Sequence, residues 1–135
     1  MKMEHANNSN CSFCTLDETR ILLTNDHAVA APDGFPVTPG HSLIIPKRHI
    51  VSFFEATREE QTALLDLLSE MRELIQKEHN PDGFNIGIND GVAAGQTVMH
   101  LHIHLIPRYL NDTEDPRGGV RWIMPEQAPY WKKQG

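Results

Sequence analysis

The spacing of apolar residues along the chain predicts one long helix. Downstream of Thr57, apolar side chains recur every three or four residues, as they do on the buried face of an α-helix: Leu64, Leu67, Leu68, Met71, Leu74 and Ile75. Thr57 and Glu60 have the spacing of a capping box, so the helix is expected to begin there. The turn-forming sequence Asn80-Pro81-Asp82-Gly83 predicts its end.

Short segments on both sides of this helix have the pattern of β-strands: residues 20–24, 27–31, 41–46, 84–88 and 100–107. The Asn25-Asp26 pair between the first two predicts a hairpin, and residues 12–20 are expected to hold a short helix or turn. Three strands, a helix and two further strands predict an α+β domain with a mainly antiparallel sheet of about five strands. The long helix is expected to lie on one face of that sheet.

The length of the chain suits one such domain. Its 135 residues can build one hydrophobic core and leave little room for a second, so residues 1–135 are expected to form a single domain. Residues 1–10 are polar and are expected to be flexible. Residues 110–135 are polar first and aromatic later. They predict a C-terminal tail that either adds a strand or forms an arm reaching a partner subunit.

Composition and charge narrow the classes of partner. Twelve Lys and Arg against 18 Asp and Glu give a net charge of −6, which disfavours a broad surface for nucleic acid or anionic membranes. The first residues lack the apolar core of a signal peptide, and no apolar run approaches the roughly 20 residues of a membrane span. A cytoplasmic location is therefore expected. There, Cys11 and Cys14 are expected to be thiols or metal ligands rather than a disulfide.

The most informative stretch contains three alternating histidines, His100, His102 and His104. In a strand all three project from one side, and the intervening residues enter the core: Leu101, Ile103 and Leu105. Adjacent histidines then lie about 6.6 Å apart and the outer two about 13 Å, whereas Zn–N bonds measure about 2.1 Å. A single ion bound by all three rings is therefore not expected, and their roles must divide.

Imidazole chemistry suggests one division of roles. An unperturbed imidazole has a pKa of about 6.5, so at neutral pH one of its nitrogens mostly carries a free lone pair. A backbone carbonyl that binds the proton of the other nitrogen would aim this lone pair at an electrophile. Attack on phosphorus would give an adduct that water can cleave, while a second histidine could protonate the leaving group.

The segment from Gly95 to Ile106 resembles the signature of the histidine triad (HIT) family, His-φ-His-φ-His-φ-φ with φ apolar. The resemblance extends back to Asn89-Asp90-Gly91 and to residues 39–49, and covers most of residues 11–108. It implies a HIT-like fold and a homodimer built around a paired sheet and helix. It also implies that His102 is the nucleophile, which forms a nucleotidyl-histidine intermediate, and that His104 contacts the reacting phosphate or the leaving group.

The resemblance implies further nucleotide-binding residues. His41 would lie near the α-phosphate, Asp33 stands where the family places a ribose-binding Asn or Asp, and three more side chains would supply hydrogen bonds: Asn89, Gln96 and Thr97.

The Cys11-x-x-Cys14 motif is by itself consistent with half a zinc site, a redox pair or chance. A redox pair would open a helix in a thioredoxin-like βαβ unit, which this chain lacks. Relatives in the family that carry such a motif complete a zinc site with two histidines. The resemblance therefore implies a structural Zn²⁺ held by four ligands: Cys11, Cys14, His49 and His100. No organic cofactor is expected.

The resemblance favours a nucleotide hydrolase or nucleotidyl transferase that acts on the α-phosphate of a nucleoside 5′-phosphate derivative, with AMP as the product of hydrolysis. Dinucleoside polyphosphates are the favoured substrates. The Gln-Thr-Val sequence before the triad and the Leu-Ile-Pro-Arg sequence after it look like the fragile histidine triad branch of the family. The CxxC motif and the acidic, glycine-containing tail look like bacterial members regarded as diadenosine polyphosphate hydrolases. Alternatives are an adenosine 5′-phosphoramidase and a non-catalytic nucleotide-binding protein. The latter would be expected to have lost His102. A metal-dependent hydrolase is disfavoured, since no acidic cluster lies near the triad in the sequence.

Overall fold

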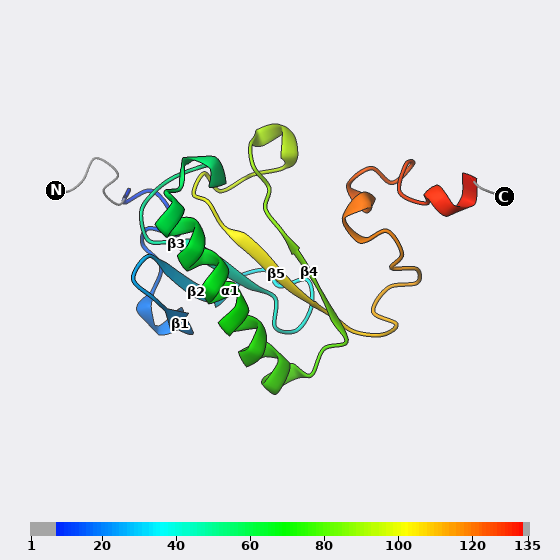
Figure 1. Cartoon of the computed structure of the whole chain (residues 1–135), viewed down its shortest axis with the longest axis horizontal. Helices are drawn as coiled ribbons and strands as arrows, with labels where there is room; N and C mark the ends of the chain where they lie inside the picture. The colour runs from blue at the N-terminus through cyan, green and yellow to red at the C-terminus, as the bar shows by residue number, and fades with distance from the viewer. Residues whose placement is uncertain (1–7, 134–135) are drawn as a thin grey trace.

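A five-stranded antiparallel sheet forms the centre of the computed structural model, which describes residues 8–133 (Figure 1). The strand order is β1-β2-β3-β5-β4, and the elements are β1 (Leu23–Thr24), β2 (Ala28–Pro32), β3 (Ser42–Pro46), β4 (Gly83–Gly87) and β5 (Ile103–Arg108). The predicted α+β class and five-stranded sheet are confirmed. Part of the segment predicted to be flexible, residues 1–7, lies outside the described residues.

The first two strands form the expected hairpin. Leu23 pairs with Ala30, and the side chain of Asn25 accepts hydrogen bonds from the backbone N–H groups of His27 and Ala28 at 3.0 and 2.9 Å. This local side-chain acceptor closes the turn. A short 3-10 helix, η1 (Glu18–Arg20), lies within the segment predicted to hold a helix or turn.

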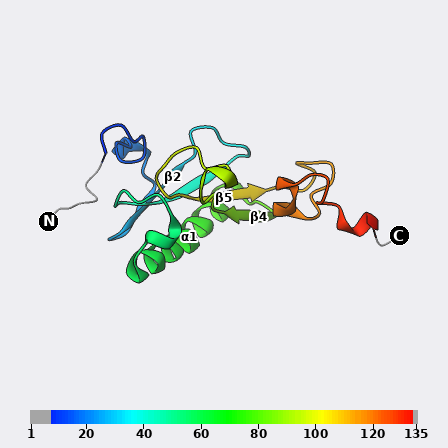
Figure 2. The ribbon, with the colours of Figure 1, turned by 90° about the horizontal axis from the view of Figure 1, so that it is seen from above.

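The helix α1 (Arg58–His79) begins at the predicted capping box. Glu60 donates its backbone N–H to Thr57 Oγ1 at 3.0 Å, and its carboxylate accepts the backbone N–H of Thr57 at 2.9 Å. Asn80 ends the helix in the left-handed conformation, with φ 50°. One face of α1 packs on the sheet through four fully buried side chains: Leu64, Leu67, Met71 and Ile75. In Figure 2, α1 covers one side of the sheet and the N-terminal segment lies on the other.

Glu60 also ties the helix start to the loop after β3. Arg48 donates to its carboxylate from Nη2 at 2.8 Å and from Nε at 2.9 Å, and these bonds are the main reason why the pKa of Glu60 is lowered to about 2. Because the folded-state pKa lies below the ordinary value, this contribution to stability is complete above about pH 4.5 and is lost as the pH falls toward 2.

We therefore expect Glu60→Gln to reduce the free energy of unfolding at neutral pH by roughly 2 to 3 kcal/mol and to flatten its acid dependence. Urea unfolding at pH 7, 4 and 3 measures this. Glu59→Gln, at an exposed position in the same turn, is the matched control and should leave the acid dependence unchanged. Parallel pH profiles for Glu60→Gln and the native chain would contradict the assignment.

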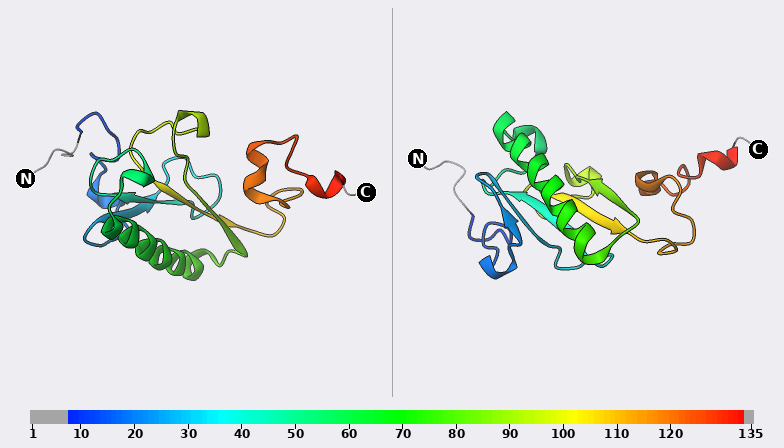
Figure 3. Two further views of the ribbon diagram at one scale, coloured as in Figure 1. Left: turned by 45° about the horizontal axis from the view of Figure 1, so that its top comes forward. Right: turned by 60° about the horizontal axis from the view of Figure 1, so that its bottom comes forward.

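Beyond β5 the chain leaves the sheet as an arm, residues 109–133, which projects away from the domain (Figures 1 and 3). It contains two short 3-10 turns, η4 (Gly119–Ile123) and η5 (Tyr130–Lys133), and its described part forms no strand. The structure therefore adds no strand to the sheet from residues 109–133. The base of the arm is held by Tyr109, whose hydroxyl donates to the Pro39 carbonyl at 2.6 Å. Several apolar side chains of the arm are exposed: Leu110, Val120, Ile123 and Met124. No helix among residues 8–133 is both long and apolar enough to span a membrane.

Candidate active site and metal centre

In residues 101–105 the imidazole side chains and the core side chains point to opposite sides of the chain. Leu101, Ile103 and Leu105 are fully buried in the core that faces α1. The alternate side chains of His102 and His104 line a pocket on the opposite face of the sheet. One detail differs from the prediction: β5 begins at Ile103, not at His100. The pairing between β3 and β5 ends at the pair formed by Ile44 and Ile103. The preceding residues are held by other bonds, such as that from the Leu101 N–H to the Ile50 carbonyl at 2.7 Å.

The pocket has a volume of about 510 Å³, in the range of small-molecule sites. Its floor is the face of the sheet that α1 does not cover, and a further wall comes from the N-terminal segment and η1. Apolar side chains form much of its lining: Phe13, Leu16, Phe35, Leu43, Ile45 and Val98. Polar groups gather at His102, His104 and Asp33. Among the described lining residues, Arg20 is the one cation.

Backbone hydrogen bonding determines the tautomer of His102. Its Nδ1 lies 2.8 Å from the carbonyl oxygen of His100, an atom that can only accept, so Nδ1 carries the proton. The lone pair of the neutral ring is therefore on Nε2. This is the arrangement that the chemistry of a histidine nucleophile requires.

His104 is linked to a second layer formed by His41 and Asp33. His41 Nε2 lies 3.0 Å from His104 Nδ1 and 3.3 Å from Asp33 Oδ2. His41 is only 4% exposed and lies behind His104 rather than among the lining residues. Burial lowers the pKa of both histidines; for His104 the neighbouring imidazoles add to this effect, and for both the Asp33 carboxylate opposes it.

The predicted ligand residues divide into two groups. Asp33, Asn89 and Thr97 line the pocket beside His102 and His104. Gln96 does not line it: the side chain accepts from the Gly91 N–H at 2.8 Å and donates to the Val51 and Val98 carbonyls at 3.0 and 3.1 Å. These bonds occupy a side chain that is only 5% exposed. Gln96 therefore holds its loop, and its side chain lies outside the pocket that Asp33, Asn89 and Thr97 line.

Several pocket residues had not been singled out from the sequence. Phe13 stands between the two cysteines, and its ring meets that of His102 edge-on at a centroid distance of 5.0 Å. Leu43 and Ile45 belong to β3, where the strand period places them on the face opposite Ile44. Period-two alternation could have identified these two residues. The contact of Phe13 joins segments almost 90 residues apart and has no local signal.

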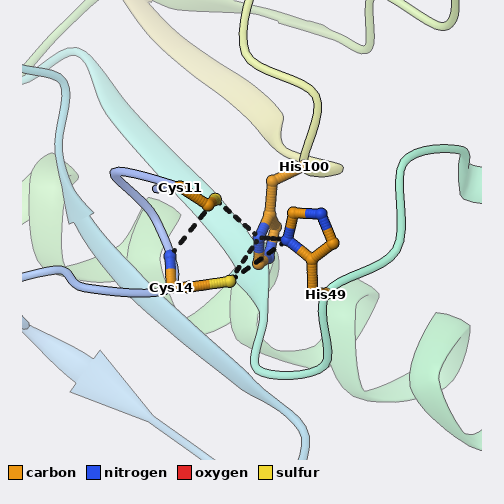
Figure 4. Close-up of side chains that lie close together, drawn as sticks. All are labelled: Cys11, Cys14, His49 and His100. Atoms are coloured by element: carbon orange, nitrogen blue, oxygen red, sulfur yellow. Dashed lines mark hydrogen bonds between the residues drawn. The ribbon is translucent and has the colours of Figure 1, made fainter. Parts of the chain in front are cut away.

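Cys11, Cys14, His49 and His100 converge on one point, as the resemblance implied (Figure 4). Their ligand atoms all lie within 4.8 Å of one another. Cys11 Sγ is 3.3 Å from His100 Nδ1, Cys14 Sγ is 3.1 Å from His49 Nδ1, and the two Nδ1 atoms are 3.1 Å apart. Tetrahedral zinc, with bonds of about 2.3 Å to sulfur and 2.05 Å to nitrogen, would separate such ligands by about 3.3 to 3.8 Å. The cluster could therefore hold a metal ion with little movement.

The surroundings of His100 suit a metal ligand. Its Nε2 donates to the Pro46 carbonyl at 2.9 Å, which leaves the lone pair on the Nδ1 that faces the sulfurs. Burial lowers the pKa of His100 and so favours the neutral, coordinating ring. Burial raises the pKa of the Cys14 thiol, so binding of a cation there would displace a proton and strengthen as the pH rises.

Asp33, His41 and His104 also lie close enough to suggest a metal site, but the hydrogen bonding argues against it. The backbone N–H of Val37 donates to His41 Nδ1 at 3.1 Å, which uses the lone pair of the neutral ring. His41 Nε2 then carries the proton and cannot coordinate a cation. Nδ1 of His100 can thus bind a metal ion, whereas Nε2 of His41 cannot.

Comparison with known proteins places these features in context. The HIT domain profile matches residues 16–111. The chain is 40% identical over 106 residues to an uncharacterized 16.1 kDa HIT-like protein of Mycoplasma pneumoniae, which covers 76% of this chain and 74% of that protein. It is 38% identical over 112 residues to the bis(5′-adenosyl)-triphosphatase of Dictyostelium discoideum, with 83% and 75% covered.

Among solved structures, the chain is similar to a zinc-bound histidine triad family protein of Mycobacterium smegmatis. The TM-score is 0.70 at 28% identity, and the match covers 92% of this chain and 96% of the other.

Proposed function

The chain belongs to the HIT domain family, and from this premise we propose that it hydrolyses dinucleoside polyphosphates at an α-phosphate and releases AMP. The observation that carries the proposal is the tautomer of His102, whose free lone pair lies on the ring nitrogen not bound to the backbone. The similarity to a bis(5′-adenosyl)-triphosphatase supports the substrate class. A pocket of about 510 Å³ with apolar walls and a polar end suits a nucleoside monophosphate unit.

The proposed reaction has two steps. His102 Nε2 attacks the α-phosphorus, a P–N bond forms, and the P–O bond to the rest of the polyphosphate breaks, with its electron pair leaving on the oxygen. The ring then carries a positive charge, which the bond from Nδ1–H to the His100 carbonyl stabilises. Water next attacks phosphorus, the P–N electron pair returns to Nε2, AMP departs, and the proton of the water passes to solvent.

Further residues of the chain have positioning roles in this proposal. Asp33 would bind the ribose hydroxyls, and Asn89 and Thr97 would donate to phosphate oxygens, since all three line the pocket. The domain would comprise residues 1–135, with the arm beyond Arg108 as an appendage.

We propose zinc as the ion of the Cys/His cluster, held by Cys11, Cys14, His49 and His100. Two thiolates and two imidazoles in a tetrahedron are a typical donor set for structural zinc, and the similar zinc-bound structure supports the choice. The ion would fix the N-terminal segment, which carries Phe13 and Leu16 of the pocket wall. Four protein ligands would fill its coordination sphere, so it would take no part in the chemistry.

A homodimer is part of the proposal. Strand β4 is an edge strand of the sheet, and Ile86 on it is 49% exposed. An apolar side chain on an open sheet edge favours pairing with a second copy, and the projecting arm offers further apolar surface. A sedimentation experiment that gives the mass of one chain would contradict this part.

The function is tested by incubating the protein separately with diadenosine triphosphate and with adenosine 5′-phosphoramidate and measuring AMP. We expect release from both, with the larger kcat/KM for the diadenosine compound. A ratio in favour of the phosphoramidate would select the alternative substrate class. Binding of AMP without release of product from either compound would favour a non-catalytic nucleotide-binding protein.

A further inference from the structure

The hydrogen bonds around His41 determine where the proton of His104 lies. The backbone N–H of Val37 can only donate, and it points at His41 Nδ1 at 3.1 Å. His41 must therefore accept there and carry its single proton on Nε2. That N–H is directed at His104 Nδ1, 3.0 Å away. His104 Nδ1 in turn accepts, so the proton of His104 lies on Nε2.

The same contacts oppose a second proton on either ring. A proton on His41 Nδ1 would face the Val37 N–H, and a proton on His104 Nδ1 would face the N–H of His41. Among residues 8–133, the titratable groups facing His104 are the rings of His41 and His102 and the carboxylate of Asp33. Asp33 is the one group there that favours a charged ring, but its Oδ2 is 3.8 Å from His104 Nδ1 and lies closer to His41, at 3.3 Å.

We propose that His41 is a positioning residue that holds His104 as a neutral hydrogen-bond donor, so that His104 binds the departing group without giving it a proton. This inference rests on the proposed function and deepens it. A neutral imidazole that donates from Nε2 can stabilise negative charge on a leaving oxygen. It cannot transfer that proton readily, because the product would be an imidazolate.

The consequence is a preference between leaving groups. A terminal phosphate has a second pKa of about 6, so it can depart unprotonated at neutral pH. An amine has a conjugate-acid pKa of about 10 and must gain a proton before or during departure. In the first step the P–O electron pair can thus remain on the polyphosphate oxygen. Cleavage of a P–N bond in the substrate instead needs an acid, which neutral His41 and His104 do not provide.

The inference is tested by ¹⁵N NMR of the histidine ring nitrogens in the zinc-loaded protein, with His104 assigned by comparison with His104→Gln. We expect His104 to be neutral and protonated at Nε2 near pH 7. His41→Gln, whose amide N–H₂ can donate in place of the ring N–H, should keep that state. His41→Leu removes the donor, so His104 Nδ1 should gain a proton at mildly acidic pH. This measurement needs no turnover, so it tests the proposal even if the protein lacks the proposed hydrolase activity.

Kinetics of the same variants supply the second readout. In His41→Leu the ratio of kcat/KM for adenosine 5′-phosphoramidate to that for diadenosine triphosphate should rise by about tenfold or more, because a charged His104 is a general acid. His41→Gln should retain the native ratio. If the native His104 is charged or protonated at Nδ1 near pH 7, the proposal is wrong, and this measurement decides the matter even where His41→Leu fails to fold.

Discussion

Replacement of His102 by alanine is expected to lower the rate of AMP release by roughly 10⁴-fold or more, because the proposed reaction path needs its ring as the covalent nucleophile. Substrate affinity should change far less, since the pocket walls remain. Single-turnover rates with diadenosine triphosphate, together with binding of AMP, separate these two effects. Acid-labile, base-stable label from an α-³²P substrate should accumulate on the native chain and be absent from the variant.

The matched control is His27→Ala, which removes an exposed histidine from the β1–β2 turn. It should turn over at the native rate. His102→Ala should also retain the native circular dichroism spectrum, because its neighbours Leu101 and Ile103 still fill the core. A His102→Ala protein that keeps a rate within tenfold of the native one would exclude the covalent mechanism.

Removal of the proposed zinc ion is expected to have the largest effect on stability. Cys14→Ser should abolish binding of one zinc per chain and lower the melting temperature by about 10 °C, equivalent to about 3 kcal/mol for a domain of this size. The reason is that Cys11 and Cys14 bond His49 and His100, and a shared ion would join the N-terminal segment to the rest of the domain. Zinc content, thermal melting and hydrogen exchange measure the effect, and exchange should increase most in residues 8–20.

Ser12→Ala, at an exposed position between the two cysteines, is the control for the metal experiment. It should retain zinc and the native melting temperature. Because Phe13 contacts His102, Cys14→Ser should also raise the KM for nucleotide. A variant that loses zinc but keeps native exchange in residues 8–20 would show that the cluster does not hold the N-terminal segment.

The elements that could be predicted from the sequence are those specified by local patterns. The helix begins directly after Thr57 because the capping box is complete within four residues, and the first hairpin closes at Asn25 through a similarly local side-chain acceptor. The sides on which Leu101 and Ile103 lie followed from the period of two. In each case, a few consecutive residues contain the physical cause.

The features that the sequence does not predict depend on contacts between segments far apart in the chain. Gln96 lies in a loop beside the pocket, but its side chain bonds the Val51 and Val98 carbonyls and does not line the pocket. His100 belongs to the same alternating sequence as His102, yet it pairs with no strand and joins the cysteines instead. Nor could the link from Val37 through His41 to His104 be inferred from spacing, since it depends on which ring nitrogen faces an amide.

The alternation around His102 limits the insertions and deletions that this chain can tolerate. Substitutions can alter the apolar face or the imidazole face of residues 101–105 one at a time. A single inserted or deleted residue would shift the phase of the whole segment and exchange the two faces, placing imidazoles in the core and leucines in the pocket. The core and the reactive group would then be lost together. We therefore expect natural length variation in this chain to fall in the arm beyond Arg108 and to spare residues 100–105.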